Sequence, residues 1–213
     1  MKTNIYIDAF NLYYGSLKGT SYRWLNVVEL ARALLPRHQI HRVRYFTAIV
    51  KTDPNRGDGK QAQRQQVYIR ALETLPELEV HLGHYLSHPT TMALETPGPG
   101  GQKFARVIKT EEKGSDVNLA TYLLLDGFKK DYEQALVISN DSDLATPVEL
   151  VQKELGFPVG VAFPCSNGHR KNSVRLKQVA TFVRQVRKPT LATCLLPGTM
   201  TDANGSFQKP AKW

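Results

Sequence analysis

The feature that most constrains the fold is an alternation of short apolar runs with longer, helix-compatible segments. Apolar runs occur near Ile5, Val43, Val80, Ala135 and Val159, and most are separated by segments with helical spacing. Strands that alternate with helices favour parallel pairing through right-handed crossovers, which place helices on both faces of a sheet. The sequence therefore predicts an α/β domain of three layers with a mainly parallel central sheet.

Segment boundaries follow from the same pattern. The expected strands are residues 4–8, 41–49, 78–85, 134–139 and 158–163. The expected helices are 24–35, 60–75, 115–128, about 143–155 and 174–186, with a last strand at the end of 174–186 as an alternative. Residues 53–59 are dense in turn formers and predict a connecting loop. Residues 96–101 (TPGPGG) predict a mobile flap, and 103–109 an edge strand or hairpin arm.

Length and composition indicate one globular domain. The chain has 213 residues and is 41% hydrophobic, and we expect a domain over 1–188 followed by a C-terminal tail over 189–213, where Gly and Pro leave little room for regular structure. The apolar runs are too short to cross a bilayer, and the N-terminus does not resemble a signal peptide, so we expect a soluble, cytoplasmic protein. Cys165 and Cys194 support neither a disulfide framework nor a zinc site.

Positive charge is concentrated near the C-terminus. The net charge is +9, and residues 168–213 hold nine Lys and Arg against one acid. This suits a polyanionic partner, although a solvated basic surface explains the charge equally well. The candidate phosphate contacts are Arg64, Arg70, Arg170, Lys171, Arg175 and Lys177.

Acidic residues follow two of the expected strands and begin one of the expected helices. Asp8 ends the first strand, Asp141 and Asp143 follow the strand that ends at Ser139, and Asp116 lies in the first turn of a helix for which Ser115 is the expected N-cap. Gly114, just before that helix, permits an unusual backbone conformation. Each aspartate taken alone could simply cap a helix or a turn.

Together these aspartates predict a metal site. In a doubly wound sheet the strand ends meet at one crevice, where clustered carboxylates repel one another unless a cation compensates. Hard oxygen ligands select Mg²⁺ or Mn²⁺ rather than zinc. Asn11, three residues after Asp8, could face the same crevice.

Three blocks of sequence resemble the signature blocks of the NYN domain family, which belongs to the PIN-like nucleases. They are residues 6–15 (YIDAFNLYYG), 111–120 (EEKGSDVNLA) and 137–144 (VISNDSDL). The resemblance implies a Rossmann-like, PIN-type fold and a ribonuclease that holds one or two divalent ions on Asp8, Asp116, Asp141 and Asp143. It also implies that Asn11, Ser139 and Asn140 orient these ligands and that Lys113 meets substrate phosphate. The bound metal would activate water for hydrolysis of RNA.

Two other functions stay open at this point. A non-catalytic module of the same fold would keep the acidic crevice and use the basic tail to bind RNA or a protein, and a phosphatase would use an aspartate as nucleophile. Tyr13, Tyr14 and Trp24 could stack on bases, although packing beneath the first loop is the preferred interpretation. A homodimer is expected only because symmetric dimers are the commonest assembly of soluble proteins.

Overall fold

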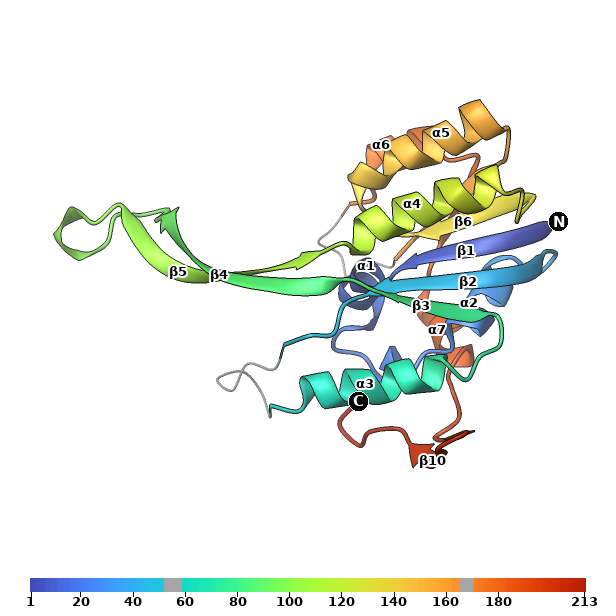
Figure 1. Cartoon of the computed structure of the whole chain (residues 1–213), viewed down its shortest axis with the longest axis horizontal. Helices are drawn as coiled ribbons and strands as arrows, with labels where there is room; N and C mark the ends of the chain where they lie inside the picture. The colour runs from blue at the N-terminus through green and yellow to red at the C-terminus, as the bar shows by residue number, and fades with distance from the viewer. Residues whose placement is uncertain (52–58, 165–170) are drawn as a thin grey trace.

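The computed structural model describes residues 1–51, 59–164 and 171–213, and its centre is a six-stranded parallel sheet in the order β3-β2-β1-β6-β7-β8 (Figure 1). The sheet strands are β1 Lys2–Asp8, β2 Gln39–Thr47, β3 Leu78–Leu82, β6 Gln134–Ile138, β7 Val159–Phe163 and β8 Phe182–Gln185. The α-helices are α1 Ala9–Leu12, α2 Val27–Leu34, α3 Gln61–Leu72, α4 Ser115–Phe128, α5 Ala145–Leu155, α6 Val174–Val179 and α7 Lys188–Thr193. The predicted three-layer α/β fold is therefore confirmed.

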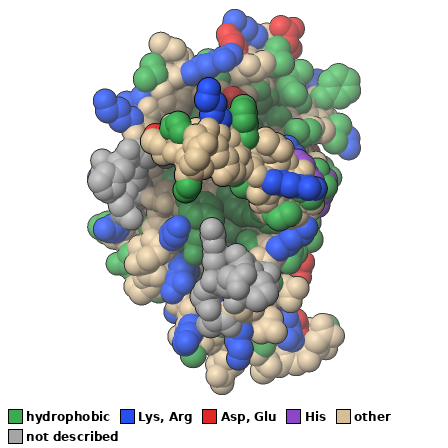
Figure 2. Space-filling model, turned by 90° about the vertical axis from the view of Figure 1, so that its left-hand side faces the viewer, with side chains coloured by type: hydrophobic (Ala, Val, Ile, Leu, Met, Phe, Trp, Pro, Cys, Tyr) green, Lys and Arg blue, Asp and Glu red, His purple; other side chains and the backbone are tan. Residues whose placement is uncertain are grey.

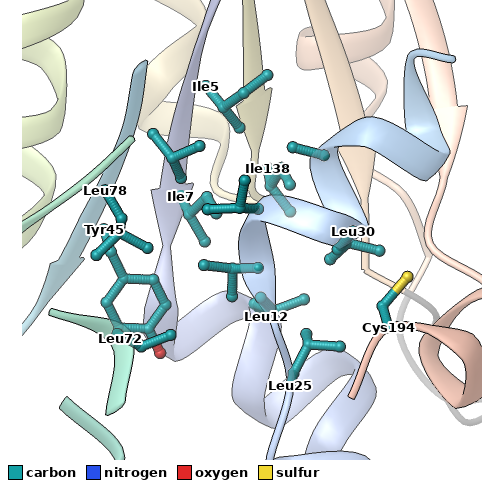
Figure 3. Close-up of a cluster of buried hydrophobic side chains, with 14 of the residues drawn as sticks. Ile5, Ile7, Leu12, Leu25, Leu30, Tyr45, Leu72, Leu78, Ile138 and Cys194 are labelled. Carbon is teal, nitrogen blue, oxygen red and sulfur yellow. The ribbon is translucent and has the colours of Figure 1, made fainter. Parts of the chain in front are cut away.

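Helices cover both faces of the sheet because its central strands are apolar on both sides. In Figure 1, α4, α5 and α6 lie on one face, and α1, α2, α3 and α7 on the other. All of β6 and β7 is buried. Along β1, Ile5 and Ile7 pack into the core beneath α2 (Figure 3), whereas Tyr6 between them packs against α4 and α5. This continuous burial is typical of parallel sheets.

A buried ion pair joins β2 to α4 on the face of the sheet that α4, α5 and α6 cover. The guanidinium of Arg44 donates to both carboxylate oxygens of Asp126, at 2.7 and 2.9 Å, and the Tyr6 hydroxyl donates to the same carboxylate at 2.7 Å. Both ionic side chains are nearly inaccessible, at 7% and 4% exposed. Burial and the neighbouring carboxylate raise the pKa of Tyr6, so the phenol stays a donor. The network fixes α4 against the sheet.

A long two-stranded hairpin leaves the sheet after β3 (Figure 1). The third strand was predicted to run through residue 85, but it ends at Leu82, and a separate strand β4 (His84–Ala93) pairs antiparallel with β5 (Phe104–Lys113). The chain turns at Gly83, where a Cβ would lie 2.4 Å from Glu112 Oε1 and 2.6 Å from the Lys113 carbonyl oxygen. The hairpin arm predicted at 103–109 is confirmed, and residues 96–101 lie at its tip.

The C-terminal segment contains regular structure that the Gly and Pro content did not predict. It forms α7 and the hairpin of β9 (Thr199–Asp202) and β10 (Gly205–Gln208). Leu191, Cys194 and Leu196 are buried in the same core cluster as Ile5. The Trp24 indole donates to the Pro197 carbonyl at 2.7 Å. Residues after 188 therefore complete the core, because they cover an apolar surface that α2 leaves open.

The described part of the chain contains no helix that is both long enough and apolar enough to span a membrane. The predicted loop at 53–59 lies almost wholly outside the described residues, as do Cys165 and Arg170.

Candidate functional site

The aspartates lie where the strand order reverses direction. From β1 the chain builds outward through β2 and β3, then returns to the other side of β1 with β6 and continues through β7 and β8. The carboxyl ends of β1 and β6 are therefore neighbours at a switch point, where open α/β sheets bind their ligands. Asp8 is the last residue of β1, and Ser139 follows β6 directly.

Asp8 is held in one orientation by three hydrogen bonds. It accepts from the Asn11 backbone N–H at 2.9 Å, from Asn11 Nδ2 at 2.6 Å and from the Ser139 hydroxyl at 2.8 Å. The residue is only 3% exposed, and burial raises the pKa of its carboxyl despite these donors, with a further contribution from Asp141. Asp8 also caps α1 through its bond with the Asn11 N–H, so the capping role that the sequence left open is present.

Asp141 and Asp143 lie on the short turn that follows β6. The Ser139 hydroxyl, while donating to Asp8, accepts from the Asp141 backbone N–H at 3.0 Å and so ties the two strand ends together. Asp141 Oδ1 accepts from the Asp143 N–H at 3.0 Å and caps the 3-10 turn Ser142–Leu144. Asp143 itself is exposed. The turn thus places one carboxylate beside Asp8 and a second at the surface.

Asn140 faces the segment before α6 rather than Asp8. Its Oδ1 accepts from the Ser173 N–H at 2.7 Å and its Nδ2 donates to the Lys171 carbonyl at 3.1 Å. Of the two residues, Ser139 therefore contacts Asp8 directly, whereas Asn140 binds the segment of residues 171–173.

Asp116 lies in the first turn of α4, but the helix is not capped as predicted. The N-cap is Gly114, in the left-handed region with φ 99°, and Ser115 lies inside the helix. The Ser115 N–H and hydroxyl donate to Glu112 Oε1 at 3.2 and 2.8 Å. The expectation that Ser115 is the N-cap was wrong: a glycine adopts this backbone angle without strain, so the N-cap is Gly114, one residue before the predicted one. The unusual conformation expected of Gly114 is present.

The acidic residues repel one another electrostatically. The pKa of Asp116 is raised to about 6, first by partial burial and then by the charges of Asp8, Asp141, Glu112 and Asp143. The four predicted aspartates therefore share one local field, although they come from three separate segments of chain. Glu112 belongs to this field and was not among the predicted site residues. Its position in the acidic block before Asp116 was the available signal.

The donors suit a hard divalent cation in their chemistry, since all are carboxylates and their mutual repulsion would be relieved by positive charge. As the side chains lie, the described residues contain no group of three or more His, Cys, Asp or Glu side chains arranged to hold a metal ion. Asp8 is instead turned toward Asn11 and Ser139.

The predicted phosphate-binding residues fall into several different places. Arg64 lines a cleft beside the aspartates. Arg70 donates to both oxygens of Asp202 at 2.7 Å and lies over the Phe207 ring, so it holds the C-terminal hairpin against α3. Lys113 lies 3.4 Å from Glu111 at the base of the long hairpin.

The remaining candidates lie around α6. Arg175 donates to the Thr146 hydroxyl at 3.2 Å, and the Lys171 carbonyl accepts from Asn140. Lys177 is in the last turn of α6. Lys171 and Arg175 thus contact residues on either side of the turn that carries Asp141, whereas Arg170 lies outside the described residues.

Comparison with known proteins supports the fold and identifies the family. A protein of unknown function from Vibrio parahaemolyticus, VPA0982, has a similar crystal structure, with a TM-score of 0.52 and 19% identity over 92% of this chain and 96% of that chain. This similarity concerns the fold alone. The 6-hydroxy-3-succinoylpyridine 3-monooxygenase HspA from Pseudomonas putida is 29% identical over all of this chain and 75% of its own length.

The match to the NYN domain extends over residues 2–184, from the start of β1 into β8. It includes all four aspartates and the strand ends that carry them. The resemblance drawn from three short blocks therefore holds for most of the chain, which belongs to the NYN domain family.

Proposed function

We propose that this protein is a metal-dependent ribonuclease that hydrolyses RNA phosphodiester bonds at Asp8, Asp116, Asp141 and Asp143. The observation that carries the proposal is the accumulation of negative charge at the switch point, expressed in the Asp116 pKa of about 6. Such a cluster destabilises the folded protein unless a cation neutralises it, so its presence favours a metal-binding role.

Each part of the centre has a distinct task in this proposal. Asp8 and Asp141 bind Mg²⁺ or Mn²⁺ directly in this proposal, because the Ser139 hydroxyl bonds to both residues and holds them together. Asp116 and Asp143 bind the ion directly or through water. Asn11 and Ser139 hold the Asp8 carboxylate in place. A bound divalent cation would supply activation of water and neutralisation of charge on the phosphate.

A second candidate is chemistry on a small heteroaromatic acid. It is favoured by the relationship to HspA, whose name describes a monooxygenase acting on a hydroxylated succinoylpyridine, and by a cleft beside Asp8 that is lined with aromatic and basic side chains. A non-catalytic module of the same fold, which binds RNA or a protein without cleaving it, is the third possibility.

One set of assays separates these functions. Single-stranded and structured RNAs are incubated with Mg²⁺ or Mn²⁺ and wild-type protein, Asp141→Asn, or Glu154→Gln, which removes an exposed carboxylate of α5 outside the site. We expect cleavage by the wild type and Glu154→Gln, and none with Asp141→Asn or with EDTA.

Cleavage that survives both Asp141→Asn and EDTA would overturn the metal-centre proposal. RNA binding without cleavage in either metal would favour the binding module. Turnover of 6-hydroxy-3-succinoylpyridine with dioxygen and a two-electron reductant, in the absence of RNA cleavage, would establish the second candidate.

A further inference from the structure

A cleft of about 1030 Å³ opens beside the aspartates, between the first helical segment, the start of α3 and the base of the long hairpin. Figure 2 looks along the hairpin onto this end of the molecule and shows hydrophobic side chains in the hollow beneath it, with Lys and Arg around the margin. The cleft begins at Ala9 and Phe10, the residues that follow Asp8. The aspartates do not line the cleft themselves, but Tyr85 in its lining pairs across the hairpin with Glu112, which contributes to the acidic field around Asp116.

Aromatic rings with solvent access line this cleft. Tyr14 is 59% exposed and meets the Tyr13 ring edge to face, with centroids 5.2 Å apart. Tyr85, the second residue of β4, also lines the cleft and makes a similar contact with Phe10, with ring centroids 6.1 Å apart. Tyr14 is exposed and Tyr85 is half-buried, so both rings keep a solvent-accessible face that suits stacking on a planar ring.

Positive charge accompanies the rings. Lys18, Arg23 and Lys51 line the cleft, and the described residues of the lining include no Asp or Glu. Lys18 lies 4.9 Å above the Tyr14 ring, Arg23 donates to the Thr20 carbonyl and Lys51 donates to the Ser87 hydroxyl. None of these three cations forms an ion pair with a carboxylate in the part of the chain that the structure describes. Their charge is available to an anion.

The inner face of the hairpin extends this surface outward. Residues paired across an antiparallel ribbon lie on the same face, and every second residue along a strand returns to it. Tyr85, Ser87, Thr110 and Ile108 are on the face that lines the cleft. The same alternation places Arg106 and the exposed Phe104 further along that face. Arg106 and Phe104 thus extend the combination of positive charge and aromatic rings beyond the cleft.

We propose that this cleft and the inner hairpin face bind single-stranded RNA on one side of the bond that the aspartates cleave. An unpaired base stacks against Tyr14 or Tyr85, and backbone phosphates lie near Lys18, Arg23 and Lys51. The inference rests on the proposed ribonuclease function and adds the form of the substrate. A duplex does not fit this arrangement, because its bases are stacked on one another and unavailable to the tyrosines.

The test measures RNA binding separately from cleavage. A short fluorescent oligouridine, and a duplex of equal length, are titrated in EDTA with wild type, Tyr14→Ala, Tyr14→Phe and Lys51→Gln. Phe128→Ala and Lys129→Gln, at the far end of α4 and both exposed, are the matched controls. Circular dichroism confirms that each variant is folded.

We expect the wild type to bind the single strand more tightly than the duplex. Tyr14→Ala weakens binding about 5- to 100-fold, the loss of roughly one stacking contact, while Tyr14→Phe keeps most of the affinity. Lys51→Gln lowers the slope of log K against log salt by about 0.7, the contribution of one phosphate contact on a single strand. The controls bind like the wild type.

Equal binding by Tyr14→Ala and wild type, preference for the duplex, or absence of RNA binding would overturn the cleft proposal. So would binding of a pyridine carboxylate in the cleft that RNA does not displace. The proposed ribonuclease function fails differently. If the protein binds the single strand through Tyr14 but cleaves no RNA in Mg²⁺ or Mn²⁺, catalysis is refuted and the binding site stands. If Tyr14→Ala leaves RNA cleavage unchanged, only the cleft proposal is refuted.

Discussion

Replacing Asp116 by Asn should stabilise the metal-free protein at neutral pH. The pKa of Asp116 is raised from 3.8 to about 6 in the folded state, by partial burial and by the neighbouring carboxylates. The folded protein therefore binds this proton more tightly than the unfolded chain does. Stability is lost as pH rises from about 3.8 to about 6, and the full penalty persists above that range. An asparagine carries no charge and escapes the penalty.

The size of the effect follows from the same shift. A difference of about 2.2 pKa units corresponds to about 3 kcal/mol at 1.36 kcal/mol per unit. Asp116 is more than one-third exposed, so solvent screens much of this repulsion, and we expect a gain of about 1 kcal/mol. For a chain of this length that gain raises the melting temperature by about 2–4 °C.

Thermal unfolding in EDTA measures this directly. Wild type and Asp116→Asn are compared at about pH 7.5 and about pH 4, with Glu154→Gln as the charge control. We expect a higher melting temperature for Asp116→Asn only at the higher pH. Adding Mg²⁺ should then stabilise the wild type more than the variant, because the cation neutralises the same cluster. A destabilised variant at about pH 7.5, or an equal gain at both pH values, would refute the account of repulsion.

Three further predictions concern the parts that hold the site. Asp126→Asn removes the buried carboxylate partner of Arg44 and leaves only the partly exposed Glu79. It should lower the free energy of unfolding by about 3 kcal/mol in urea titrations, whereas a loss below about 1 kcal/mol would show that the pair is not desolvated. Gly83→Ala places a Cβ against Glu112 and the Lys113 carbonyl, so RNA cleavage should fall severalfold while far-UV circular dichroism stays unchanged. Unaltered cleavage would show that the junction between β3 and the hairpin does not influence the aspartates. Leu191→Ala should cost about 2–4 kcal/mol in urea, as for a core leucine, and a negligible cost would mean that α7 is peripheral.

The parts of the fold that local pattern determines were predictable from the sequence. The buried strands β1, β6 and β7 each contain a short apolar run, and α4 was predicted over residues 115–128, where it lies. The position of Asp8 at a strand end followed from the run before it. These features depend on residues close together in the chain, where periodicity carries the information.

Features decided by contacts between distant segments were not predictable. The strand pattern of β3 continues into Tyr85, and only the close approach of Gly83 to Glu112 explains why the chain leaves the sheet. The segment after residue 188 is core because Leu191 and Cys194 meet α2, which no local pattern reveals. The cleft likewise contains Tyr14 and Tyr85, which are 71 positions apart, so only the folded structure shows that they line the same surface.

The measurement that tests the central claim most directly is RNA cleavage followed together with Mn²⁺ occupancy, read from the electron paramagnetic resonance signal of free Mn²⁺. The account predicts that the cleavage rate of the wild type rises in proportion to bound Mn²⁺, and that Asp8→Asn and Asp141→Asn lose binding and cleavage together while Glu154→Gln keeps both. Cleavage without bound Mn²⁺ under metal-free conditions, or full Mn²⁺ binding by Asp8→Asn and Asp141→Asn, would contradict it.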